Sequence, residues 1–421
     1  MLGRFHLISA LVILAAKLCC ATETPPSSKA ARIDELVSRY ERYGYINGAV
    51  LVAEHGEVIY KKGIGYADME LHTPNTPQTK FGIASITKQF TAALVLQQAV
   101  EGVIRLDAKV TDYLPWYRRD TGERMMIEQL LHHTSGLPPD FESPEFSESE
   151  AASRYYGPQT FAEKFCQPNL SSEPGTKWDY SNCGYILLGL ILERETGQRY
   201  GDLLRQRLLD PLGMKDSGMD RNDLMQLGGA AGYVRHAGPR YTPGPYIDRS
   251  HIFAAGAMYS TAEDLFRWSQ VLSGDAVLPK EIRDQVFQPG LSNWGYGWFV
   301  TKIPPGVPGA GSTLEEMRGD MPGNYFCWIL RYPEQDDVII VLRNVYGSTE
   351  RLEGNLQAIL FDQEPHMPSR SPKDVAARAW QVLAAWVNSH RGLSVLVILL
   401  AAAGIWQTAR RRRRIRVSNH T

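Results

Sequence analysis

A serine and a lysine three residues apart begin an apolar helical segment, and this segment constrains fold and chemistry more than any other. Residues 81–90 read FGIASITKQF, a pattern that predicts a helix continuing to Val100 and ending near Gly102. Ser85 and Lys88 would share one face of it, because residues three apart are neighbours on a helix. A hydroxyl beside an amine is an activated nucleophile, and a helix start stabilises nearby negative charge. The spacing therefore predicts a catalytic serine.

The spacing of Ser85 and Lys88 is weak evidence by itself, because the same pattern also arises by chance. Serine and lysine are common, so an S-x-x-K pattern arises by accident roughly once or twice in a chain of this length. The apolar positions add support, because they recur at helical spacing and would bury one face: Ile86, Phe90, Ala93, Leu94 and Leu96. The catalytic interpretation then depends on partners further along the chain.

A phenol and an amide stand two residues apart in a loop that leads into a second apolar helix, expected over residues 186–195. Tyr180 and Asn182 lie in the run KWDYSNCGY at 177–185. In an extended segment, residues two apart point the same way, so both would face one cleft. A phenol can relay protons, and an amide can hold both a lysine and a substrate carbonyl.

The histidines predict neither a second catalytic centre nor a metal site. His132 and His133 stand beside Ser135, but adjacent side chains diverge, so we expect them to hold a turn by hydrogen bonds. No cluster of Cys and His has zinc spacing, and no cofactor is expected.

Composition favours a packed enzyme over a disordered or nucleic-acid-binding chain. The 421 residues include 45 Lys and Arg against 46 Asp and Glu, so the net charge is −1. That balance gives no basic excess to attract nucleic acid. A hydrophobic fraction of 43% is ordinary for a globular enzyme, and the length accommodates one enzyme core with a subdomain and end segments.

Both ends of the chain carry apolar runs with basic neighbours. Residues 7–16 are apolar and follow Arg4, and small residues then allow cleavage after Ala21, so residues 1–21 are predicted to be a signal peptide. A retained N-terminal anchor is the alternative, for which the run is short. Near the other end, residues 392–409 would form about 27 Å of helix at about 1.5 Å per residue, just enough to span a bilayer.

A basic tail, residues 410–421, orients this C-terminal segment. Positive residues stay in the cytoplasm, which leaves residues 22–391 outside it. We therefore expect a single-pass protein of the cell membrane, held by contacts between its C-terminal helix and lipid, with its main domain on the periplasmic or extracytoplasmic side. A linker and juxtamembrane helix are expected over residues 368–391. A surface-lying or buried helix is the alternative, and a stop-transfer anchor explains the tail without RNA binding.

Cysteine usage leaves the pairing open. After cleavage Cys166, Cys183 and Cys327 remain, an odd number for an exported protein. At most one disulfide can form, and the pattern implies none.

Strand patterns fall at both ends of the main domain, with helices between them. An amphipathic helix is expected over residues 30–43, a strand hairpin over 48–60, and two further strands over 324–332 and 337–344. This order predicts an α/β fold of the α+β type. Its mainly antiparallel sheet would be closed by the terminal strands and flanked by helices, with a helical subdomain over about 100–250.

Seven motifs follow one another along the chain: SITK at 85–88, LHHTSGL at 131–137, PG at 174–175, YSN at 180–182, PLGM at 211–214, AGAMYSTAEDL at 255–265 and GDMPG at 319–323. With these motifs, the chain resembles the serine beta-lactamase and penicillin-binding-protein superfamily over about Gly48 to Asn344, in the branch of class C beta-lactamases, D-alanyl-D-alanine carboxypeptidases and related esterases. The resemblance implies a beta-lactamase-like fold over residues 30–367 and acyl transfer through a covalent serine ester.

The resemblance also implies roles for six residues. The expected catalytic residues are Ser85 as nucleophile, with Lys88 and Tyr180 for proton transfer. The expected substrate-binding residues are Asn182, which would also hold Lys88, Gly319 and Asp320. The backbone N–H groups of Ser85 and Asp320 would form the oxyanion hole, and water would then release the acyl group.

The third motif departs from the family pattern. Members usually carry Lys-Thr-Gly or His-x-Gly on the strand facing the serine, and aligning Gly319 with that glycine places Met317 at the Lys or His position. Arg318 is next to it, but neighbours on a strand point to opposite faces, so it is no automatic substitute. We therefore expect recognition of a substrate carboxylate to differ, and we rank esterase or peptidase action above beta-lactam hydrolysis.

Three functions stay open at this point. The first is an exported, membrane-anchored serine hydrolase that cleaves an ester or amide of a small or peptide-like substrate. The second is a weakly active penicillin-binding-like module that binds cell-wall peptides or a partner without efficient turnover. The third is a membrane scaffold that keeps the fold for interaction alone.

Overall fold

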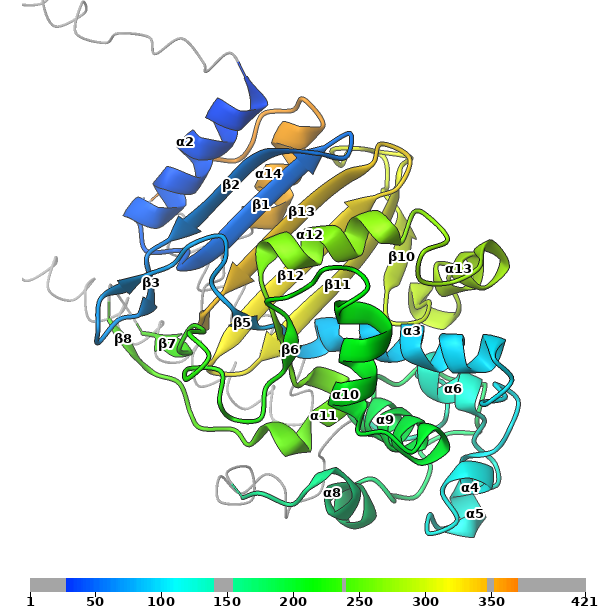
Figure 1. The fold of residues 1–421 in the computed structure, drawn as a ribbon. Helices are drawn as coiled ribbons and strands as arrows, with labels where there is room; N and C mark the ends of the chain where they lie inside the picture. The colour runs from blue at the N-terminus through cyan, green and yellow to red at the C-terminus, as the bar shows by residue number, and fades with distance from the viewer. Residues whose placement is uncertain (1–27, 140–153, 237–239, 347–351, 370–421) are drawn as a thin grey trace, which may run out of the picture. The chain divides into compact units, whose positions relative to one another are not determined.

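A six-stranded antiparallel sheet forms the centre of the structure, a computed structural model that describes residues 28–139, 154–236, 240–346 and 352–369 (Figure 1). The strand order is β10-β11-β12-β13-β1-β2. The strands are β1 (Gly48–Glu54), β2 (Glu57–Ile64), β10 (Phe299–Lys302), β11 (Thr313–Met321), β12 (Tyr325–Tyr332) and β13 (Asp337–Arg343).

The neighbouring strands β1 and β13 bring together the two ends of the described chain. β1 and β13 pair antiparallel, with Leu51 opposite Ile340, and nearly every residue of both is buried. Both are rich in Val, Ile, Leu and Ala, as expected of strands covered on both faces. The antiparallel sheet closed by strands from both ends is thus present.

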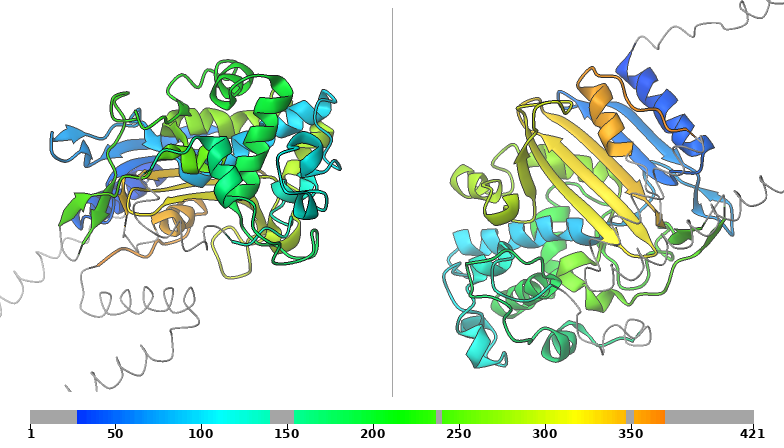
Figure 2. Two further views of the ribbon diagram at one scale, coloured as in Figure 1. Left: turned by 90° about the horizontal axis from the view of Figure 1, so that it is seen from below. Right: turned by 180° about the vertical axis from the view of Figure 1, so that it is seen from behind.

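Helices cover both faces of this sheet. α14 packs on one face and α12 on the other, and α2 lies beside α14 (Figures 1 and 2). The amide of Asn355 on α14 donates to the Tyr40 hydroxyl on α2 over 2.8 Å, which ties together two helices far apart in sequence. The longer helices are α2 (Lys29–Arg42), α3 (Thr87–Val100), α8 (Pro158–Phe165), α9 (Asn182–Thr196), α12 (Ala262–Val271), α13 (Lys280–Val286) and α14 (Leu352–Leu360).

Short elements connect the sheet to the helices. The short helices are α4 (Val110–Tyr113), α5 (Arg119–Gly122), α6 (Ile127–Leu131), α10 (Tyr200–Leu204), α11 (Phe253–Gly256), η1 (Ala84–Ile86), η2 (Arg205–Leu209), η3 (Arg249–His251) and η4 (Leu291–Asn293). The short strands are β3 (Tyr66–Asp68), β4 (Thr73–Pro74), β5 (Phe81–Gly82), β6 (Gly218–Met219), β7 (Tyr233–Arg235), β8 (Tyr241–Pro243), β9 (Met258–Ser260) and β14 (Val345–Tyr346).

Helix α3 is buried on every side rather than on one face. The apolar positions expected to be buried are buried, but so are Lys88 and Thr91. Since a buried polar group needs a partner, each has one: the Thr91 hydroxyl donates to the Ala254 carbonyl over 2.6 Å. The helix that follows the serine is therefore a central element of the core.

A disulfide joins Cys166, at the end of α8, to Cys183, in the first turn of α9. Cys327 is a free thiol in the core, where burial raises its pKa to about 12. The one disulfide that three cysteines allow is therefore formed, although their spacing could not show which pair would form it.

The expected end segments lie outside the described residues. This applies to the signal peptide at 1–21, the membrane span at 392–409, the basic tail at 410–421 and nearly all of the 368–391 segment. In the portion of the chain that is described, no helix combines the length and the apolar character needed to cross a bilayer.

Candidate active site

Ser85 lies in the single 3-10 turn that connects β5 to α3. The turn is tight: Ala84 has a φ of 46°, and the Ile83 N–H donates to the Met258 carbonyl over 2.9 Å, which continues the pairing of β5 with β9. The sequence placed Ser85 on the α-helix itself, but the α-helix begins only at Thr87, and Ser85 lies in the 3-10 turn before it. Residues three apart also superimpose in a 3-10 turn, so Ser85 still faces Lys88.

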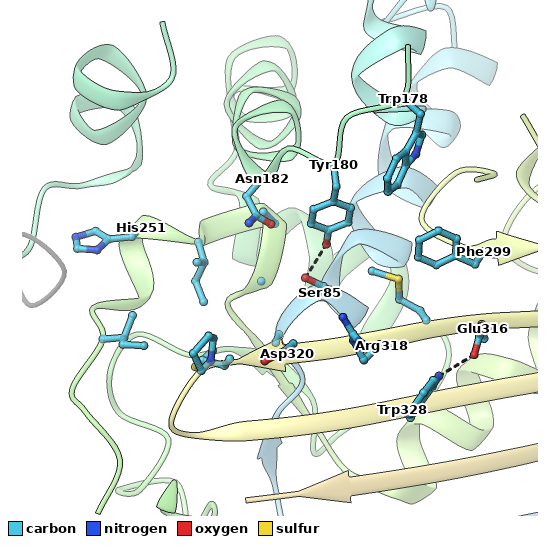
Figure 3. A pocket seen from close by; sticks show the side chains of 18 residues that line it. Ser85, Trp178, Tyr180, Asn182, His251, Phe299, Glu316, Arg318, Asp320 and Trp328 are labelled. Carbon is cyan, nitrogen blue, oxygen red and sulfur yellow. Dashed lines mark hydrogen bonds between the residues drawn. The ribbon is translucent and has the colours of Figure 1, made fainter. Parts of the chain in front are cut away.

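The Ser85 hydroxyl receives two hydrogen bonds. The Tyr180 hydroxyl donates to Ser85 Oγ over 2.7 Å (Figure 3), and Lys88 Nζ donates to the same oxygen over 3.2 Å. Ser85 is half-buried, whereas Lys88 is fully buried. Ser85 Oγ therefore lies between two hydrogen-bond donors, the Tyr180 phenol and the Lys88 amine, and the open cleft.

Lys88 is fixed by oxygen acceptors. Its Nζ donates to Asn182 Oδ1 over 2.5 Å and to the Ala255 carbonyl over 2.8 Å, and it lies 4.8 Å from the centre of the Tyr180 ring. A positive charge held here stabilises negative charge on the Tyr180 and Ser85 oxygens. Ala255 was not expected as a partner. The run of small residues from 254 to 257 permits the close backbone approach, but a sequence does not show where a carbonyl points.

Asn182 begins helix α9 instead of lying in an extended segment. Ser181 caps the helix in an extended conformation, so Tyr180 stands in the loop and Asn182 is the first helical residue. The two side chains nevertheless reach the same place, because the loop turns into the helix beside Ser85 (Figure 3).

His133 lies behind Tyr180 and holds its loop. The Ser181 N–H donates to His133 Nδ1 over 3.2 Å, the Asp179 N–H donates to the His133 carbonyl over 2.9 Å, and the His133 and Tyr180 rings are 4.4 Å apart. Burial and the nearby Lys88 charge hold the His133 pKa well below 6.5, so the ring is neutral. His132 packs instead on Tyr296. The interpretation of these histidines as parts of a hydrogen-bonded turn fits this arrangement.

Strand β11 forms the opposite wall of the cleft. A Cβ atom on Gly319 would lie 2.1 Å from the Ile83 carbonyl oxygen, so only glycine allows the strand this close to the Ser85 turn. Asp320 is the next residue and lines the cleft. The alignment of Gly319 with the third-motif glycine therefore has a physical basis.

The two residues before Gly319 both line the cleft. Met317 is buried on the side of Gly319, while Arg318 is exposed and extends into the same cleft (Figure 3). Met317 and Arg318 lie on opposite faces of β11, as expected, but the Arg318 side chain still lines the cleft. The reason is that β10 pairs with β11 only as far as Glu316, so the remaining edge of β11 borders the cleft.

The cleft has a volume of about 810 Å³ and mostly apolar walls. Trp178, Phe299 and Trp328 lie on the same side of Ser85, and Ile247 and Ile252 belong to the rest of the lining. A cavity of this size, with a few convergent polar groups, is typical of a small-molecule site.

The comparisons with known proteins agree with this geometry. The chain matches the family model described as Beta-lactamase over residues 31–364, and it belongs to that family. It is 29% identical over 359 residues to a penicillin-binding protein of Bacillus subtilis (strain 168), covering 79% of this chain and 76% of that protein. It is also 29% identical over 326 residues to the protein flp of Staphylococcus aureus (strain MW2), covering 75% of this chain but only 63% of flp.

A solved structure shares the fold. The D-amino acid amidase from Ochrobactrum anthropi SV3, complexed with L-phenylalanine amide, superposes with a TM-score of 0.65 at 25% identity, covering 78% of this chain and 96% of that one. The expected superfamily is thus confirmed, together with its mixed α/β fold, and the chain belongs to the general class of serine hydrolases.

Proposed function

We propose that this protein cleaves an ester or amide bond through an acyl-enzyme on Ser85. The observation that carries the proposal is the pair of hydrogen bonds to Ser85 Oγ, from Tyr180 at 2.7 Å and from Lys88 at 3.2 Å, beside an open cleft. A nucleophile within hydrogen-bond reach of a base, which is itself held by a third group, is the arrangement that covalent catalysis requires.

In this reaction the Ser85 oxygen attacks the substrate carbonyl carbon while its proton moves to the Tyr180 oxygen, which reacts as a phenolate stabilised by the Lys88 ammonium. The N–H groups of Ser85 and Asp320 stabilise the resulting oxyanion. The carbon–leaving-group bond then breaks, and the leaving group takes the proton from Tyr180. Water attacks the ester on Ser85 by the same proton route, which releases the acid and restores the hydroxyl.

We rank esters and amides of peptide-like compounds above beta-lactams as substrates. The buried Met317 provides no charge for a substrate carboxylate at the position where the family has Lys or His. The amidase structure of the same fold, named as a complex with L-phenylalanine amide, supports an amide substrate.

A direct test compares the full-length protein with its Ser85→Ala variant on two reagents, a p-nitrophenyl ester and a fluorescent penicillin. A burst of p-nitrophenol that requires Ser85 is expected. Stable penicillin labelling without turnover would instead favour the weakly active binding module. A folded protein with neither label nor Ser85-dependent hydrolysis would leave only the scaffold.

Export and anchoring form a second part of the proposal. The Cys166–Cys183 disulfide supports an oxidising compartment, since disulfides persist outside the cytosol. Deleting residues 392–421 should release the protein into the soluble fraction. A truncated protein that stays with the membrane would contradict the proposed C-terminal span.

A further inference from the structure

The carboxylate of Asp320 lines the cleft without a partner. No described residue donates a hydrogen bond to it or forms an ion pair with it, and its Oδ1 atom is buried. Burial raises the Asp320 pKa above its ordinary 3.8, and the Arg318 guanidinium opposes this rise. A desolvated carboxylate left without a donor is costly, so it invites a ligand that supplies one.

The other acidic side chains of β11 do have partners. Glu316 accepts a hydrogen bond from the Trp328 indole over 3.0 Å, and Glu315 forms a buried ion pair with Arg331. Asp320 thus differs from its neighbours on the same strand, although Glu316 also lines the cleft.

The position of Asp320 sets where its ligand must lie. It follows Gly319, whose backbone packs against Ile83 and Ala84 just before Ser85. Its carboxylate therefore lies within a few ångströms of its own N–H, which is the proposed oxyanion donor. Negative charge that develops on a carbonyl oxygen there is opposed by the carboxylate unless a cation compensates it.

An α-ammonium group meets both requirements. It lies two bonds from the carbonyl carbon of an amino acid amide or ester, so it reaches Asp320 when that carbonyl stands at Ser85. It donates up to three hydrogen bonds and carries the compensating charge. The apolar cleft walls at Ile247 and Ile252 suit an apolar side chain on the same amino acid.

We infer that Asp320 binds the free α-ammonium of an aminoacyl substrate, so that the protein acts on amides or esters of apolar amino acids. This rests on the proposed function of Ser85 and adds the class of substrate. The Asp320 carboxylate then contributes to substrate binding and to the rate of Ser85 acylation. The rate is affected because the bound ammonium offsets the repulsion between the carboxylate and the developing oxyanion.

The turnover test uses the full-length protein at about pH 6.5, where an α-ammonium is largely charged. It compares phenylalanine p-nitroanilide, as each enantiomer, with 3-phenylpropanoyl p-nitroanilide, which lacks only the amine. We expect kcat/KM to favour the amine by about tenfold or more, and Asp320→Asn to remove most of that ratio. The variant should lose more kcat/KM on the amine substrate than on the desamino one, so the readout is the ratio of the two values.

Glu316→Gln is the matched control, because this carboxylate lines the same cleft but already has a partner. It should leave the ratio between the two substrates unchanged within about twofold. A wild-type ratio near one, or a ratio that Asp320→Asn leaves intact, overturns the inference.

A binding test separates this inference from the proposed function. In the Ser85→Ala protein, calorimetry compares phenylalanine amide with 3-phenylpropanamide, with and without Asp320→Asn. Tighter binding of the amine that Asp320→Asn abolishes supports the ammonium site even if no substrate turns over. In that case only the hydrolase proposal fails. Equal affinity for both amides overturns the ammonium site even if Ser85 proves catalytic.

Discussion

The two walls of the cleft differ in how completely their polar groups are satisfied. The helix side, defined as Ser85, Lys88, Tyr180 and Asn182, forms a closed hydrogen-bonded set. The strand side, defined as residues 317–321 of β11, carries two charged residues without an ion pair to any described residue: Arg318, whose guanidinium lies 5.8 Å from the centre of the Phe326 ring, and Asp320. The polar groups of the helix side have their partners before substrate binds, whereas the charged groups of the strand side would gain theirs from the substrate.

This difference separates chemistry from selectivity. Groups that must transfer protons need fixed distances, and burial within the core supplies them on the helix side. The strand side offers an edge that β10 leaves uncovered, where charges can contact a ligand. Substitutions on the helix side should therefore abolish turnover, whereas those on the strand side should change which substrate is turned over.

The largest effect is expected for Lys88→Met, which keeps the side-chain length but removes the charge. We expect kcat/KM for a p-nitrophenyl ester to fall by about 10³-fold or more, since the proton route to Ser85 is lost. Lys61→Met is the control, because Lys61 lies on β2, is exposed and forms an ion pair with Glu263 on α12. A Lys88→Met protein that folds and keeps activity within about tenfold of wild type would remove the helix side from the mechanism.

Gly319→Ala tests the contact between the two walls. The added Cβ would meet the Ile83 carbonyl oxygen at 2.1 Å, so β11 must move away from Ser85. We expect a loss of kcat/KM of about 10–100-fold and destabilisation by about 1–3 kcal/mol in urea unfolding.

Gly354→Ala is the matched control for that substitution. Gly354 lies in α14, and its Cβ would meet nothing within 4 Å. Alanine there should stabilise the protein by about 0.5–1 kcal/mol and leave activity unchanged. Equal activity of the two alanine variants would contradict the role given to Gly319.

The smallest effect is a pH dependence at His133, behind the helix side. Its folded pKa is below 6.5, so below that pH the unfolded chain binds a proton that the folded chain does not, and stability falls as pH falls. His132 and His251 also have lowered pKa values and act in the same direction. His133→Asn keeps an acceptor but does not titrate, so its stability should depend less on pH.

Urea unfolding at pH 7.5 and 5.5 measures this contribution. The difference in unfolding free energy between wild type and His133→Asn should narrow by about 1 kcal/mol on acidification. An unchanged difference would show that folding does not lower the His133 pKa, which would contradict this account.

The sequence predicted the helix side better than the strand side, for a physical reason. Ser85 and Lys88 are local neighbours, so their spacing alone places them together. The loop with Tyr180 and Asn182 leads into a strongly apolar helix, which could be recognised. The buried strands β1 and β13 could likewise be recognised as unbroken apolar runs.

The remaining features depend on tertiary contacts that no local pattern encodes. The Ala255 carbonyl reaches Lys88 only because α11 packs against α3. Arg318 reaches the cleft because β10 ends early, and the Cys166–Cys183 pairing depends on how α8 meets α9. Alternation along a strand predicts faces correctly, but it does not predict which edge of that strand is left open.

The most direct measurement of the central claim is mass spectrometry of the full-length protein quenched in acid during turnover of a slowly hydrolysed ester. The account predicts one added acyl mass, located on the peptide that contains Ser85, absent from Ser85→Ala and accumulating in the steady state. An acyl mass on another residue, or one that persists unchanged in Ser85→Ala, would contradict it.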